Sequence, residues 1–136
     1  MEARALIRAA MEGRQRAYVP YSGYGVGAAL LAKSGKVYRG CNVENAAYGP
    51  TNCAERTAFF KAVSEGEREF EAIAIVGGPA GGALQSSISP CGVCRQVMQE
   101  FCRPDFKIYL AWGEEDYREF TLAQLLPLGF GPDNLK

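Results

Sequence analysis

Hydrophobic and polar positions recur with two different periods along this chain, and the changes of period mark its elements. Between residues 3 and 17 apolar residues recur at helical spacing with charges between them, which predicts an amphipathic helix over Ala3–Ala17. Two short apolar stretches follow, Val26–Leu31 and Lys36–Cys41, and Ser34-Gly35 between them is typical of a tight turn. The pattern therefore predicts an N-terminal helix followed by a β-hairpin.

The middle of the chain changes from helical to strand-like spacing. Ala54–Glu65 has a helical pattern, and Gly66 after it is a stop signal. The apolar run "AIAIVGG" (Ala72–Gly78) is consistent with a buried strand. The stretch Gly77–Ser87 is rich in glycine, alanine and serine, and it predicts a flexible loop.

The last third repeats this alternation. A helix is expected to begin near Cys91, with an apolar stripe formed by Cys94, Val97, Met98 and Phe101. "FKIYLAW" (Phe106–Trp112) predicts another strand, and "TLAQ" (Thr121–Gln124) has the capping-box spacing that opens a short helix before Pro127. Strands that alternate with helices indicate an α/β domain with helices packed on a central sheet.

Length and charge narrow the functional classes. A chain of 136 residues with 48% hydrophobic residues fits one domain, residues 1–136, with a core that needs no disulfides. Fifteen Lys and Arg residues balance fifteen Asp and Glu residues, so nucleic acid is not an expected partner. A net charge near zero favours self-association instead.

The sequence also indicates the cellular compartment in which the protein is expected. No apolar run approaches the roughly 20 residues of a membrane span, and the charged N-terminal stretch is unlike a signal peptide. We therefore expect a cytoplasmic protein with no membrane partner. Five cysteines in a reducing compartment indicate metal binding, catalysis or plain burial rather than a disulfide framework.

Three of the cysteines have the spacing of a metal site. "PCGVC" places Cys91 and Cys94 on one face at the start of a helix, and Cys53 lies at the start of another. Helix N-termini stabilise thiolates, so three sulfurs that converge from two helix starts predict a zinc site. Three protein ligands leave a fourth position open, as in catalytic zinc sites.

The remaining cysteines and the CxxC motif keep other interpretations open. Cys102 lies more than two helical turns after Cys94 and cannot reach the same ion, whereas Cys41 is harder to exclude; we expect both to be simply buried. A lone CxxC is also typical of a redox pair or of half a structural zinc knot.

Glu55 has a structural and a catalytic interpretation. With Asn52 as the N-cap, Glu55 would occupy the third helical position, where a carboxylate caps the backbone. Its place two residues after Cys53 instead lets it reach water at the metal and move that water's proton. Arg56 beside the thiolates would offset their charge, since three thiolates and Zn²⁺ sum to one negative charge.

Four motifs in order resemble the small homotetrameric cytidine deaminases: "PYSGYGVGAAL", "GCNVENAAYG", "CAERTAFFKA" and "SPCGVCRQV". The similarity covers roughly Tyr18–Phe130 and is to the all-cysteine zinc type. It implies a three-layer α/β/α domain with a central mixed five-stranded sheet. It also implies one Zn²⁺ per subunit, a small-molecule nucleoside substrate, and hydrolytic deamination of cytidine and deoxycytidine in pyrimidine salvage.

The resemblance also implies roles for individual residues. Cys53, Cys91 and Cys94 would hold zinc, and Glu55 would move protons to the pyrimidine N3 and to the leaving amine. Substrate contacts would come from the ribose-binding pair Asn42 and Glu44, the Ala54 backbone, and Tyr24, which stands where the family usually has phenylalanine. In a homotetramer, neighbouring subunits or the pocket rim would contribute Ala46, Tyr48, Tyr21 and Phe130.

Three alternatives stay open at this point. One is a related deaminase that acts on another cytosine nucleoside such as blasticidin S, although "NVEN" argues for a ribose. Another is a zinc-stabilised binding module without catalysis, which would need a fourth protein ligand. A thiol–disulfide oxidoreductase that uses Cys91 and Cys94 is the third.

Overall fold

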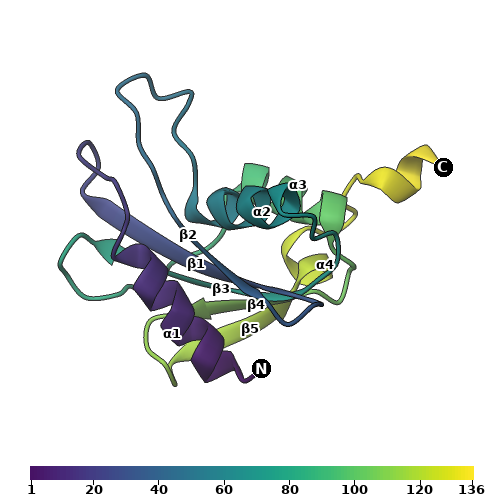
Figure 1. The fold of residues 1–136 in the computed structure, drawn as a ribbon, viewed down its shortest axis with the longest axis horizontal. Coiled ribbons are helices and arrows are strands. Elements are labelled where there is room, and N and C mark those ends of the chain that lie inside the picture. Colours follow the sequence, from purple (N-terminus) through teal and green to yellow (C-terminus); the bar gives the residue numbers. More distant parts are fainter.

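Five strands form one mixed sheet in the computed structural model, which describes all of residues 1–136 (Figure 1). Their spatial order is β2-β1-β3-β4-β5. Only β3 and β4 run parallel, and every other neighbouring pair is antiparallel. The strands are β1 (Tyr24–Ala32), β2 (Val37–Cys41), β3 (Phe70–Pro79), β4 (Lys107–Ala111) and β5 (Tyr117–Thr121).

Helices cover both faces of this sheet, which confirms the predicted three layers. In Figure 1, α1 (Ala3–Arg14) lies on one side, and α2 (Ala54–Ser64) and α3 (Gly92–Phe101) lie on the other. The α1 layer buries Leu6 and Ile7 against one sheet face. The opposite layer is larger and is built around Phe59, which packs edge-on against Phe70 at 5.2 Å between ring centroids.

The local signals at the β1–β2 turn and at the start of α4 are confirmed. The β1–β2 hairpin turns at Ser34-Gly35, where Gly35 has a φ of 94° that favours glycine. α4 (Leu122–Leu125) has the predicted capping box, because Thr121 N–H donates to Gln124 Oε1 at 2.8 Å and Gln124 N–H donates to Thr121 Oγ1 at 3.3 Å. A 3₁₀ turn, η1 (Pro132–Leu135), follows near the C-terminus.

Some element boundaries differ from the predicted ones. α1 ends at Arg14 rather than Ala17, since the next three N–H groups bond to the carbonyl three residues back, as in a tight turn. The predicted loop Gly77–Ser87 begins within β3, which continues to Pro79 in its pairing with β1. β5 was not predicted from the pattern, because its residues are exposed or half-buried at the sheet edge.

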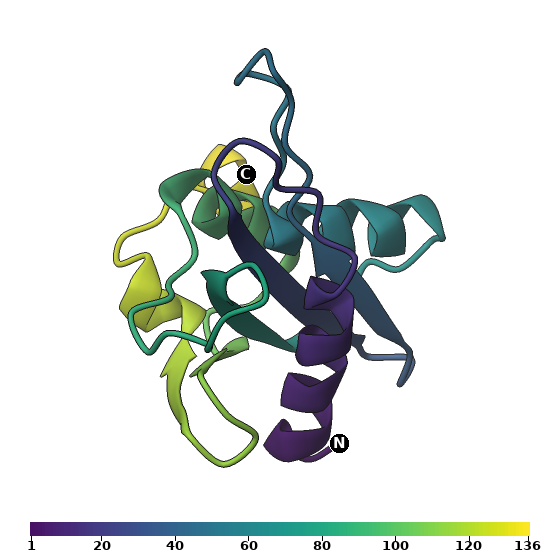
Figure 2. The same ribbon diagram turned by 90° about the vertical axis from the view of Figure 1, so that its left-hand side faces the viewer.

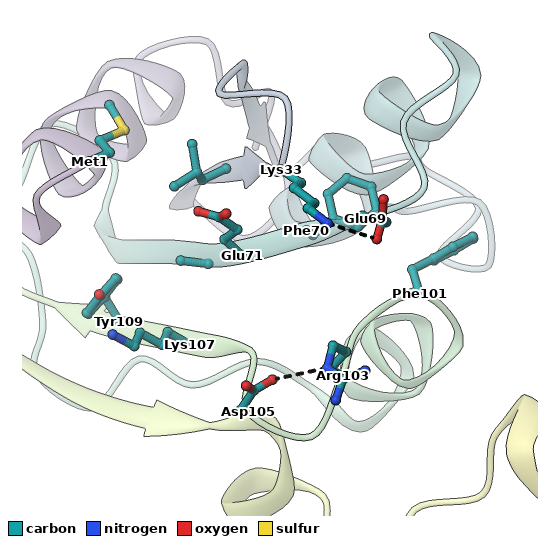
Figure 3. Close-up of a pocket in the computed structure, with 12 residues that line it drawn as sticks. Met1, Lys33, Glu69, Phe70, Glu71, Phe101, Arg103, Asp105, Lys107 and Tyr109 are labelled. Carbon is teal, nitrogen blue, oxygen red and sulfur yellow. Dashed lines mark ion pairs between the residues drawn. The ribbon is translucent and has the colours of Figure 1, made fainter.

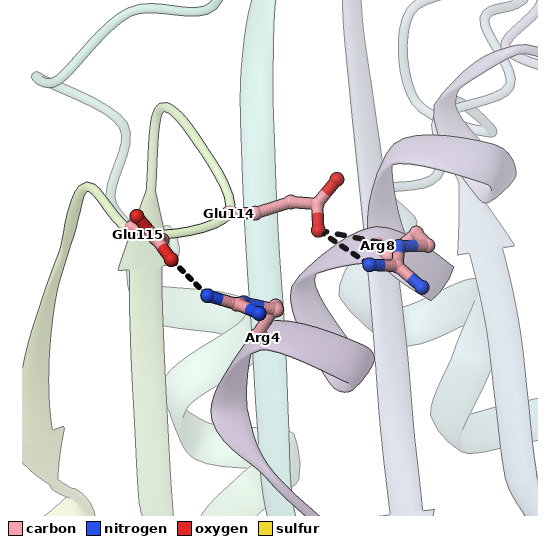
Figure 4. A network of polar contacts seen from close by, with 4 residues as sticks. All are labelled: Arg4, Arg8, Glu114 and Glu115. Atoms are coloured by element: carbon pink, nitrogen blue, oxygen red, sulfur yellow. Dashed lines mark hydrogen bonds and ion pairs between the residues drawn. The ribbon is translucent and has the colours of Figure 1, made fainter.

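Two ion pairs connect α1 to the turn between β4 and β5 (Figure 4). Arg8 Nη2 lies 2.7 Å from Glu114 Oε1, and Arg4 pairs with Glu115 one helical turn earlier. All four side chains are at least one-third exposed, so each pair stabilises the fold by only about 0–1 kcal/mol. No helix in the structure combines the length and apolar character that a membrane crossing requires.

Candidate metal centre

The N-termini of α2 and α3 bring three cysteine side chains together. Cys53 is the N-cap of α2, Cys91 is the N-cap of α3, and Cys94 lies in the first turns of α3. The Sγ atom of Cys91 lies 3.8 Å from that of Cys53 and 3.4 Å from that of Cys94. All three sulfurs are within 4.8 Å of one another, as predicted from the spacing.

The geometry and chemistry of these sulfurs fit zinc. With Zn–S bonds of about 2.3 Å and tetrahedral angles, two sulfur ligands stand roughly 3.8 Å apart. The observed separations are close to that value. Cys41 and Cys102 lie outside the cluster, and burial raises the pKa of both thiols, so they are poor ligands where they stand.

Close packing of α2 on β2 fixes the position of the helix start that carries Cys53. A Cβ atom on Gly40 of β2 would lie 2.3 Å from the Ala54 carbonyl oxygen and 2.7 Å from the Ala58 nitrogen. The first turn of α2 therefore rests directly on the strand backbone. Because the free N–H groups of a helix start carry partial positive charge, this placement favours a thiolate at Cys53.

The hydrogen bonds around Cys53 favour the thiolate as well. They lower the pKa of Cys53, and the hydrogen bond from the thiol of Cys94 contributes most, followed by the one from Arg56. Arg56 Nη2 donates to Cys53 Sγ at 3.2 Å. Arg56 Nε is buried and has no partner, so an unused donor lies beside the cluster, which fits a site that carries excess negative charge.

Glu55 is the one charged side chain among the buried residues, with only 4% of its surface exposed. Burial raises its pKa to about 7, and the negative charge of Cys53 contributes in the same direction. The suggested N-cap at Asn52 is wrong: Cys53 is the N-cap, Glu55 is the second helical residue, and α2 has no side-chain cap. Glu55 thus lies one position earlier in the helix than the capping interpretation assumed, and its side chain is buried.

The comparisons with known proteins agree with this site. Residues 1–110 match the family model described as "Cytidine and deoxycytidylate deaminase zinc-binding region". The chain belongs to the cytidine and deoxycytidylate deaminase family. A cytidine deaminase from Sporosarcina psychrophila is 51% identical over 99% of this chain and 96% of its own length.

Solved structures place the fold in the same family. The crystal structure of a cytidine deaminase from Burkholderia pseudomallei has a TM-score of 0.85 and 50% identity, and the match covers 96% of this chain and 100% of that one. A blasticidin-S deaminase from Bacillus cereus is 32% identical over 77% of this chain and 76% of its own length. The chain is thus more similar to the named cytidine deaminases than to that relative.

Asn42, expected to contact a ribose, holds the start of β1 in this deaminase. Its Oδ1 accepts from the Val26 N–H at 2.9 Å, and its Nδ2 donates to the Tyr24 carbonyl at 2.9 Å. One N–H and one lone pair of the amide remain for another partner. Tyr24 is half-buried and packs against the core beneath α2 and α3, so Asn42 also fixes where this ring stands.

Glu44 is likewise held by the segment before β1. Its Oε1 accepts from the N–H groups of Tyr21 and Ser22, both at 3.0 Å, and its Oε2 accepts from the Ser22 hydroxyl. The hydroxyl contact is the main reason that the pKa of Glu44 is lowered, so the group is a carboxylate. Ser22 was missed at the sequence level, since nothing in its local pattern indicates a partner twenty-two positions away.

Ala54 is fully buried at the start of α2, whereas the four expected rim residues lie on exposed segments. Figure 2 shows the connection between β2 and α2 rising from the body, and this loop carries Ala46 and Tyr48. A cavity of about 310 Å³ is lined by Tyr21, Ser22, Glu44, Asn45, Tyr48 and Thr51. Phe130 is exposed, and its carbonyl accepts from Gln96 Nε2 on α3 at 2.8 Å.

A larger cavity, of about 460 Å³, lies at the opposite end of α3 from the cysteines and includes none of the predicted site residues (Figure 3). Two ion pairs neutralise most of its charge. Lys33 Nζ lies 3.5 Å from Glu69 Oε1, and Arg103 Nε lies 3.9 Å from Asp105 Oδ1. The metal centre is therefore assigned by its chemistry rather than by cavity size.

Proposed function

We propose that this chain hydrolytically deaminates cytidine and deoxycytidine, giving the uridine nucleoside and ammonia. One observation carries the proposal: a buried carboxylate, Glu55, stands two residues from Cys53 in a cluster of three thiols that fits zinc. The family membership and the names of the relatives support the same reaction.

Glu55 has the properties of a proton carrier. Its pKa of about 7 allows it to accept a proton from water and to donate one at neutral pH. We propose that Glu55 takes one proton of the attacking water and delivers it to N3 of the pyrimidine. It then takes the proton of the new C4 hydroxyl and delivers it to the amino group, so that the C4–N bond breaks as the C4 carbonyl forms. The carboxylate returns to its starting state when ammonia leaves.

Cys53, Cys91 and Cys94 are the proposed ligands of one zinc ion per subunit. Zinc bound there would supply a Lewis acid that lets water attack at neutral pH. Arg56 donates to the Cys53 sulfur and would reduce the excess negative charge of three thiolates. Its role is to keep the ligands in place and to limit the charge that they bring to the metal.

The proposed nucleoside contacts come from three elements around the centre. Ala54 is the first residue of α2, so its N–H has no partner within the helix and would donate to a pyrimidine carbonyl. Tyr24 would pack against the base. Asn42 and Glu44 would bind the ribose hydroxyls with the amide and carboxylate atoms that their β1 and Ser22 contacts leave free.

The assembled enzyme is proposed to be a homotetramer of single-domain chains, residues 1–136, acting in the cytoplasm in pyrimidine salvage. Exposed aromatic side chains support an assembly in which neighbouring subunits complete each pocket. Tyr48 is 80% exposed on the raised loop, and Tyr21 and Phe130 are more than half exposed. Ala46 lies on the same loop as Tyr48. Light scattering of the active protein tests this: a fully active monomer contradicts it.

Replacement of Glu55 by glutamine tests the reaction directly. The variant keeps the size of the side chain but removes proton transfer, so we expect cytidine turnover to fall by at least about 100-fold. Zinc content, measured by atomic absorption, should stay at one ion per chain. A Glu55→Gln protein that deaminates cytidine at the native rate would refute the assignment.

The native protein and Glu55→Gln also distinguish the deaminase from the alternative functions. A zinc-stabilised binding module would show no deamination in either protein, and a dithiol oxidoreductase would show chelator-insensitive thiol exchange. Parallel assays with cytidine and blasticidin S separate the two deaminase specificities, and we expect cytidine to be the better substrate. The ribose-binding pair Asn42 and Glu44 is the feature that supports this order.

A further inference from the structure

The three proposed zinc ligands are held in place to different degrees. Cys94 is 1% exposed, so the core around α3 fixes its sulfur. Cys53 is half-buried and accepts a hydrogen bond from Arg56. Cys91 is exposed, sits at the N-cap of α3, and makes no side-chain capping bond. Its position depends on the backbone that leads into the helix.

Arg95 contacts Cys91 and the two residues that precede it. Its guanidinium donates from Nε to the Pro90 carbonyl at 2.8 Å and from Nη2 to Ser89 Oγ at 2.7 Å. Its main-chain N–H donates to the Cys91 carbonyl at 3.0 Å. One residue therefore bonds to all three residues of the segment Ser89–Cys91.

A third guanidinium bond joins this segment to the C-terminal part of the fold. Arg95 Nη1 donates to the Leu125 carbonyl at 2.6 Å, at the end of α4. None of the ion pairs in the structure includes Arg95, so its charge is directed at neutral oxygen atoms rather than at a carboxylate. The guanidinium thus links the entry to α3 with the exit from α4.

We propose that Arg95 is a positioning residue that holds the Cys91 sulfur at ligand distance from Cys53 and Cys94. This inference rests on the assignment of the three cysteines as zinc ligands. Loss of the guanidinium leaves Cys91 attached to a segment with fewer restraints, and a ligand that moves away more often releases the metal faster. Substitutions in the residues that orient metal ligands typically cost about 10–100-fold in metal affinity.

Metal release measures this role independently of turnover. Zinc transfer to a chromogenic chelator is followed in the native protein and in Arg95→Met, which keeps the length of the side chain without its donors. Cobalt-substituted forms of both proteins are then compared by their thiolate-to-metal absorption bands. Arg103→Met is the matched control, because Arg103 lies just past the same helix, is exposed, and pairs only weakly with Asp105.

We expect Arg95→Met to release zinc at least about tenfold faster than the native protein, with altered cobalt bands, and Arg103→Met to behave as native. Arg95→Lys keeps the charge and a single donor group, so its rate of zinc release should lie between those of Arg95→Met and the native protein. Ser89→Ala removes one of the three guanidinium bonds and should increase release by a smaller factor, which keeps the test informative should Arg95→Met fail to fold.

Native release rates and cobalt bands in both Arg95→Met and Ser89→Ala would overturn the proposal. A lowered melting temperature of metal-free Arg95→Met with unchanged release would also overturn it, since Arg95 would then serve the fold alone. The ligand assignment fails separately: native protein without stoichiometric metal or without cobalt–thiolate bands refutes the three cysteines themselves.

Discussion

Replacement of Gly40 by alanine should displace the start of α2 from the sheet. The new Cβ atom would lie 2.3 Å from the Ala54 carbonyl oxygen, and both groups belong to backbone that no side-chain rotation can move. To restore a contact of roughly 3.5 Å, helix and strand must separate by about 1 Å. Ala54 lies between Cys53, a proposed zinc ligand, and Glu55, the proposed proton carrier, so the displacement reaches both.

The magnitude follows from these distances. Overpacking a well-packed core typically destabilises a protein by about 1–3 kcal/mol, so the Gly40→Ala chain should still fold. A misplacement of about 1 Å at a catalytic group costs on the order of 100-fold in rate. We therefore expect a loss of kcat/KM for cytidine that is much larger than the loss of stability alone would cause.

Steady-state kinetics at saturating zinc and urea unfolding measure the two effects separately. Gly25→Ala is the matched control on β1, because its Cβ would lie 3.6 Å from the nearest atoms, an ordinary contact. It should unfold and turn over nearly as the native protein does. A Gly40→Ala protein with native kcat/KM would show that the close packing of α2 on β2 does not set the geometry of the site.

Two further predictions concern charge. Arg56→Ala removes the donor to Cys53 and should lower turnover by about tenfold while zinc stays bound; unchanged kinetics at full zinc occupancy would contradict this. Glu67 accepts from Ser34 Oγ at 2.7 Å and from Tyr38 OH at 2.9 Å, and these bonds lower its pKa. Its stabilising effect is present above its ordinary pKa of 4.5 and is lost as pH falls through the lower folded value. The free energy of unfolding of Glu67→Gln should therefore fall less steeply than that of the native protein as the pH drops below 4.5. The same pH dependence in both proteins would contradict this role of Glu67.

The cysteine cluster could be predicted because the positions of its residues follow local rules. Cys91 and Cys94 share a helix face by their spacing alone, and Cys53 precedes a recognisable helical pattern. The burial of Glu55 could not be predicted in this way. Burial arises from tertiary packing, such as that of the first turn of α2 on Gly40 of β2, which joins residues far apart in the sequence.

In the rest of the proposed binding site, too, the sequence pattern indicates the residues but not their tertiary contacts. "NVEN" identified Asn42 and Glu44 as candidates, but their partners lie sixteen to twenty-three positions earlier in the chain. No periodic pattern records such contacts. The missed strand β5 has a related cause, since an edge strand with exposed charged residues has no continuous apolar face.

The cysteine cluster also has a consequence for chain topology. Cys53 and Cys91 are thirty-eight positions apart, and the connecting segment contains α2 and the central strand β3. A metal that joins them acts as a removable cross-link, which restricts the unfolded chain in the way that a long loop closure does. During synthesis the ligand set is incomplete until Cys94 has left the ribosome. A metal held by all three cysteines would therefore bind only after the central strand β3, which lies between Cys53 and Cys91 in the sequence, has been synthesised.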